Sequence, residues 1–140
     1  MATLGFKTYQ MNQQEIQLVC QSWQQAAEEP LRLAILFFDR LFEEAPELRQ
    51  VFRTPMSEKT RQLLVFFGFH INRLASGSIR RPSFEAYVWE ELLTDAQKGF
   101  LMETLSDTVA ALLKPDWTPA LQGAWGSFRK SCQPYYIAVH

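Results

Sequence analysis

The chain has 140 residues, 47% of them hydrophobic and 21% charged, which is enough for one globular domain with its own core. Its formal net charge of -1 excludes nucleic-acid or anionic-lipid binding that depends on bulk charge, and no apolar run approaches the ~20 residues that cross a bilayer. Two cysteines are too few for a disulfide framework or a zinc site. We therefore expect a cytoplasmic protein with no nucleic-acid and no membrane partner.

The first predicted helix follows a short N-terminal segment. Residues 1–11 lack a secretory pattern, and we expect them to be a flexible extension of a single domain that spans 1–140. Asn12 and Glu15 have the spacing of a capping box, which marks a helix start. The expected apolar face of this helix consists of Ile16, Val19, Cys20, Trp23 and Ala26.

The second predicted helix begins at Glu29 and Pro30, since proline is tolerated at the first helical position. Its expected apolar face consists of Leu33, Phe37, Phe38, Leu41 and Phe42. Pro46 begins a short turn that ends at Phe52, and Thr54 and Pro55 precede a long third helix. The expected apolar side of that helix consists of Leu63, Phe66, Phe67, His70 and Leu74.

A loop with Gly77 and Pro82 is expected next, and Ser83 can cap a short helix over residues 84–93. Thr94 and Gln97 form a second capping-box pattern. The following helix is expected to end before Pro115, and its apolar residues are Phe100, Leu101, Thr104, Leu105, Val109 and Leu112. The last helix is expected to begin at Thr118 and Pro119 and to end or kink at Pro134, with Leu121, Trp125, Phe128 and Cys132 in register.

The pattern predicts an all-α protein of about six to seven helices with unequal lengths, which favours a globin-like fold over a four-helix bundle. Three passages resemble the globin superfamily in order and spacing: Ile35 to Phe52 resembles the second globin helix with the turn after it, Lys59 to Leu74 the distal helix, and Leu101 to Trp125 the last two helices. The resemblance covers nearly the whole chain.

The resemblance implies a pocket for a flat ligand. Its distal side would be formed by Phe38, Phe52, Lys59, Leu63 and Phe66. Phe52 stands at the position of the globin phenylalanine that stacks on haem, and Lys59 stands where globins usually have histidine or glutamine. Plain core packing is an equally compatible interpretation of the apolar members. Leu105 is expected on the same pocket from the following long helix, and His70 is either a core histidine or a polar group aimed at the ligand.

The proximal side departs from the globin pattern. The ligating histidine would fall near Val88, but residues 84–93 contain no histidine, cysteine or methionine. Tyr87 is the only potential ligand there, and tyrosinate ligation of haem is rare. The chain has two histidines in all, His70 and His140, and neither has the proximal spacing. The resemblance therefore implies a globin pocket without ordinary iron ligation.

Three functions remain open. The chain is similar to bacterial bilin-associated globins, which are related to phycobiliproteins, and this implies a non-enzymatic binder of a linear tetrapyrrole (bilin). No cysteine lies in the distal-helix region, so the pigment would be held non-covalently. The second hypothesis is a haem globin with unusual ligation by Tyr87, Lys59 or His70 that acts on oxygen or nitric oxide. The third is a cofactor-free globin that senses a lipid or binds a protein partner, for which a homodimer is one form.

Other chemistry has no support in the residues. No serine or cysteine has a histidine in an interpretable motif, and no glycine-rich phosphate loop is present. We predict no catalytic residue and no metal ligand. Cys20 and Cys132 are interpreted as small buried hydrophobic residues.

Overall fold

Helices dominate the computed structural model, which describes residues 11–76, 89 and 91–138, the last six of them as backbone only. Within these ranges the structure contains no strand and gives the bounds of five α-helices and one short 3-10 helix: α1 (Gln13–Ala27), α2 (Pro30–Glu44), η1 (Pro46–Gln50), α3 (Met56–Ser76), α5 (Asp95–Leu113) and α6 (Pro119–Ala138). Trp89, Glu91 and Leu92 are helical as well. The all-α prediction is confirmed. The expected segment 1–11 lies outside the described residues except for Met11, and so does most of the short helix expected over 84–93.

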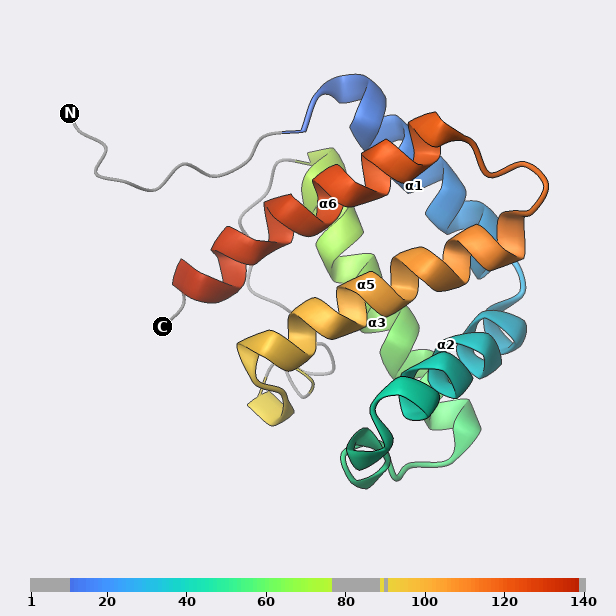
Figure 1. Ribbon diagram of the computed structural model, residues 1–140, viewed down its shortest axis with the longest axis vertical. Coiled ribbons are helices and arrows are strands. Elements are labelled where there is room, and N and C mark those ends of the chain that lie inside the picture. Colours follow the sequence, from blue (N-terminus) through green and yellow to red (C-terminus); the bar gives the residue numbers. More distant parts are fainter. Residues whose placement is uncertain (1–10, 77–88, 90, 139–140) are drawn as a thin grey trace.

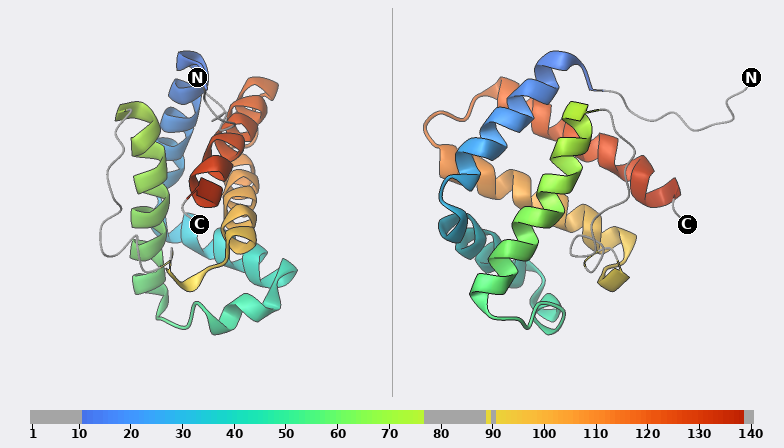
Figure 2. Two further views of the ribbon diagram at one scale, coloured as in Figure 1. Left: turned by 90° about the vertical axis from the view of Figure 1, so that its left-hand side faces the viewer. Right: turned by 180° about the vertical axis from the view of Figure 1, so that it is seen from behind.

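The five long helices form two layers with one helix across their end (Figures 1 and 2). In one layer α1 packs beside α3, and in the other α5 packs beside α6. The α2 helix crosses below both layers and contacts α3 and α5. Because α2 touches both layers, the aromatic residues on its inner face lie where the layers meet.

Local sequence signals set most helix starts. Asn12 and Glu15 form the predicted capping box of α1, with each side chain bonded to the other residue's backbone N–H, at 2.8 and 3.1 Å. Thr94 and Gln97 do the same for α5, at 3.1 and 2.9 Å. Both capping boxes are therefore confirmed. Each one satisfies two N–H groups that a helix start would otherwise leave unpaired.

The predicted helix faces agree with the observed burial. All five predicted apolar residues of α2 are buried, and so are Leu63, Phe66, Phe67 and His70 of α3. Three other residues of the predicted faces are only half-buried: Leu74, Phe100 and Leu121. Val19, Trp23 and Ala26 of α1 are buried, while Ile16 and Cys20 lie at the edge of the core. A single hydrophobic cluster joins buried residues from every helix of the described chain.

Two details at the C-terminal ends of α5 and α6 differ from the sequence prediction. The α6 helix continues past Pro134 to Ala138, so an end at Pro134 is wrong. A proline removes one backbone donor and crowds the preceding turn, but close to a helix end few bonds depend on that turn, so the helix can continue. In α5 the residue buried near the end is Leu113, while the predicted Leu112 is only half-buried.

A buried hydrogen bond ties α1 to α6. The indole Nε1 of Trp125 donates to Ser22 Oγ at 2.9 Å, and both side chains are buried. The same hydroxyl donates to the carbonyl of Leu18 at 2.6 Å, which is a turn earlier in α1. The bond from Trp125 to Ser22 satisfies the indole N–H, which would be costly to bury without a partner.

Candidate functional site

Six aromatic side chains meet where α2, α3 and the segment before α5 converge. We call them the ring cluster: Phe37, Phe38, Phe52, Phe66, Phe67 and Trp89. The two α2 rings come from the inner face of that helix, Phe52 follows η1, and two more rings come from α3. All six are buried. The cluster therefore contains Phe38, Phe52 and Phe66, three of the residues predicted to line a ligand pocket.

Trp89 lies at the centre of this cluster. Its ring centroid is 4.9 Å from that of Phe52 and 5.2 Å from that of Phe66. It also contacts Phe38 at 6.2 Å and Phe67 at 6.4 Å. Three of these four pairs have the edge-to-face geometry that aromatic rings prefer, and the pair with Phe66 is tilted. Because Trp89 is 1% exposed, its indole adjoins almost no space that a water molecule could occupy.

The sequence did not single out Trp89. Its backbone carbonyl accepts a hydrogen bond from the N–H of Leu93 at 3.2 Å, which is the spacing of a helical turn, and both side chains are buried. A large apolar residue four positions before a leucine was the available signal. The predicted proximal residues Tyr87 and Val88 directly precede Trp89 in the chain, but they lie outside the described residues.

The remaining predicted site residues of the described chain, apart from Lys59, are buried next to the rings. Leu63 and Leu105 belong to the same hydrophobic cluster and are fully buried. The His70 imidazole is fully buried as well, and it packs edge-on against Phe66 at 4.9 Å and Phe69 at 5.1 Å. In this conformation the described residues of the proposed slot are buried and belong to one packed cluster, apart from Lys59 at its edge.

A cationic edge borders the ring cluster. The Lys59 Nζ lies 5.2 Å from the ring centroid of Phe38 and 5.5 Å from that of Phe42. The Arg49 guanidinium lies 5.1 Å from the centroid of the same Phe42 ring. Cation–π contacts of this kind contribute roughly 0.5–1 kcal/mol each at exposed sites. The structure thus brings Lys59 to the predicted pocket, with an arginine nearby that could share the binding of a carboxylate.

The two cysteines behave as small hydrophobic residues. Cys132 is buried and Cys20 is half-buried, and both are free thiols. Burial raises the pKa of the Cys20 thiol because a thiolate is poorly solvated there. The parts of the chain that the structure describes contain no group of three or more His, Cys, Asp or Glu side chains placed to hold a metal ion.

Comparison of the sequence with protein-family models and with curated proteins gives no match. Among the helices of the described chain, none is both long enough and apolar enough to span a bilayer. The site is therefore characterised by its own residues: a closed aromatic cluster around Trp89, a buried histidine at its inner end and a lysine at its edge.

Proposed function

We propose that the protein is a non-enzymatic, globin-fold binder of a tetrapyrrole, and that its ligand is a linear tetrapyrrole held without a covalent bond. The observation that carries the proposal is the ring cluster bordered by Lys59, whose Nζ is 5.2 Å from the Phe38 ring centroid. A bilin is a flat conjugated molecule with carboxylate side groups, so it requires aromatic surfaces and a cation together. It requires no axial ligand, and no histidine lies in residues 84–93.

The globin-like fold is part of this proposal. Its support is the succession of unequal helices, with the short η1 after α2 and with Phe52 between η1 and α3. The steep crossing of α2 under the two layers is a further likeness (Figure 2).

Each residue has a proposed role. Phe38, Phe52 and Phe66 would stack on the pigment, and Leu63 and Leu105 would form its apolar walls. Lys59 would pair with a propionate carboxylate. His70 would accept a hydrogen bond from a pyrrole N–H or donate one to a lactam oxygen. A single polar group in an otherwise apolar pocket fixes the orientation of the ligand.

The indole of Trp89 and the pigment would compete for one volume. The described rings are buried and pack directly against one another. A bound pigment must therefore replace the contacts that Trp89 now makes with Phe52 and Phe66. Displacement of Trp89 would change its fluorescence, which provides a readout independent of the pigment's own absorption.

The test is a titration of the full chain with biliverdin. We expect a sharpened red absorption band and a change in tryptophan fluorescence at the same pigment concentration. Lys59→Gln should weaken binding by roughly tenfold to a hundredfold, because charged hydrogen bonds contribute about 1.5–3 kcal/mol. Arg61→Gln is the matched control, since this exposed arginine of α3 pairs with Glu58 at 3.8 Å on the surface. Unchanged spectra of both pigment and protein would refute the proposal.

The same protein is titrated with haem to test the alternative. A Soret band that disappears in Tyr87→Phe, Lys59→Ala or His70→Ala would favour a haem globin with unusual ligation. A lipid that co-purifies with pigment-free protein would favour the sensor hypothesis instead.

A further inference from the structure

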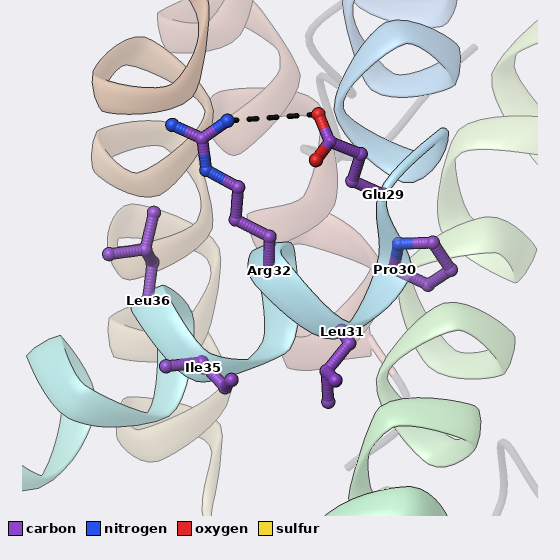
Figure 3. A pocket seen from close by; sticks show the side chains of 6 residues that line it. All are labelled: Glu29, Pro30, Leu31, Arg32, Ile35 and Leu36. Atoms are coloured by element: carbon purple, nitrogen blue, oxygen red, sulfur yellow. Dashed lines mark ion pairs between the residues drawn. The ribbon is translucent and has the colours of Figure 1, made fainter.

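The outward face of α2 carries exposed apolar side chains. Leu31 is 54% exposed and Ile35 is 41% exposed, and Leu36 lies beside them (Figure 3). The only other large hydrophobic residue this exposed in the described chain is Leu92, which lies outside α2. A shallow hollow of about 550 Å³ runs along the α2 face and is lined by Glu29, Pro30, Leu31, Arg32, Ile35 and Leu36. Exposed apolar side chains that cluster beside a hollow are a common mark of an interface.

Two charged residues, Arg32 and Asp39, flank the apolar residues on this face of α2. Arg32, Ile35, Leu36 and Asp39 have the spacing i, i+3, i+4 and i+7, which places them on one stripe. We call them the α2 stripe. Arg32 pairs with Glu29 at 3.7 Å, but both side chains are largely exposed. Such a pair contributes little to stability, so Arg32 can leave Glu29 for another acidic partner. The Asp39 side chain forms no hydrogen bond or ion pair within the part of the chain that the structure describes.

The stripe is complementary to itself when it is reversed. In an antiparallel copy, Ile35 meets Leu36 of the partner subunit, and Arg32 meets Asp39 of the partner subunit. Each of these contacts then occurs twice, as a two-fold axis requires. A parallel copy would instead place Arg32 opposite Arg32. The order of residues thus selects both the partner and its orientation.

We propose that the protein forms a homodimer in which the α2 stripes of two copies cross in antiparallel orientation. Ile35 and Leu36 form the apolar centre, and Leu31 extends it over the aliphatic part of Arg40 of the partner subunit. Two Arg32–Asp39 ion pairs flank this centre. A crossing angle near −50°, common for helices packed through their i±4 ridges, lets the helix ends diverge. The divergence separates the acidic ends, Glu28 of one copy and Glu43 of the other, which would otherwise repel. This inference does not depend on a pigment.

The oligomeric state is measured by sedimentation velocity on the full, pigment-free chain over a concentration series. We expect a dimer that dissociates on dilution, and Ile35→Arg should yield only monomer. Leu92→Arg is the matched control, because it places the same charge at another exposed residue, 53% against 41% for Ile35, and should leave the dimer intact. All substituted residues are exposed, so circular dichroism should show unchanged folding.

Charge exchange tests the orientation. Arg32→Asp and Asp39→Arg, each alone, place like charges opposite one another twice and should raise the dimer dissociation constant on the order of tenfold to a hundredfold. The double variant restores opposite charges and should recover the dimer. A monomeric native chain, or a dimer that survives Ile35→Arg, overturns the proposal. Failure of the double variant to recover the dimer overturns the antiparallel orientation and the Arg32–Asp39 ion pairs, while the choice of a second copy as partner rests on the native dimer and its loss in Ile35→Arg.

Discussion

Replacing Trp89 with alanine should reduce the stability of the protein strongly. The indole is 1% exposed and contacts four rings, with centroid distances from 4.9 Å to 6.4 Å. Truncation of a buried tryptophan to alanine costs roughly 3–5 kcal/mol, the sum of lost transfer free energy and the cavity left behind. The indole Nε1 donates to Gln62 Oε1 at 3.4 Å, and such a long hydrogen bond adds little. We therefore expect a loss near 4 kcal/mol, about the middle of that range.

The assay is urea unfolding followed by circular dichroism. With a slope of about 2 kcal/mol per molar urea, this loss lowers the unfolding midpoint by roughly 2 M. Trp117→Ala is the matched control, because Trp117 is only half-buried and its Nε1 donates to Gln122 on the surface at 2.9 Å. Because Trp117 is half-buried and packs against the edge of the core, we expect the control to lose roughly half as much as Trp89→Ala.

Trp89→Ala should raise the affinity for pigment while it lowers the stability of the protein. If the pigment and the indole compete for one volume, Trp89→Ala should bind biliverdin more tightly than the native chain although it is less stable. Equal stability losses in Trp89→Ala and Trp117→Ala would show that the indole is not the centre of the core. A lower biliverdin affinity in Trp89→Ala would contradict the competition between indole and pigment.

Three further predictions concern the frame around the ring cluster. Ser22→Ala leaves the buried indole N–H of Trp125 without its acceptor, and urea unfolding should show a loss of about 1–3 kcal/mol in the free energy of unfolding. The same substitution should cost less in a Trp125→Phe background, which has no indole N–H. An unchanged loss in that background would contradict the coupling of the two residues. Thr94→Ala removes the cap of α5 and should cost about 1 kcal/mol in the same assay, whereas Ser57→Ala, at an exposed position of α3, should cost much less. Because burial raises the pKa of the Cys20 thiol, its alkylation by iodoacetamide near neutral pH should be slower than that of glutathione, and mass spectrometry would detect the reverse order if it occurred.

Helix starts and the buried faces of α2 and α3 could be predicted because their signals are local. A capping box needs only three residues of spacing, and the apolar rings of α2 and α3 recur at helical intervals. The contact between Ser22 and Trp125 joins residues 103 positions apart, so no local pattern contains it. It depends on how α1 and α6 pack.

The candidate site was predictable only in part. Resemblance to the globins placed Phe38, Phe52 and Lys59 on one pocket, and the structure brings these three together. The resemblance gave no indication of Trp89. In the globin pattern this part of the chain supplies the ligand of an iron atom, and the pattern does not predict a ring that fills the site. Helical spacing left Leu31 and Ile35 outside the predicted face of α2, but it could not show whether another helix covers them.

The closed packing around Trp89 has a consequence for ligand selectivity. A protein whose core is complete without a ligand holds its binding-competent arrangement only as a minor population, and its apparent affinity falls by that fraction. If about 1% of the molecules are open, the measured Kd is about a hundredfold weaker than the intrinsic one. Small aromatic metabolites, which gain little from a few ring contacts, would then be rejected. Only a ligand large enough to contact most of the six rings and Lys59 at once would bind appreciably.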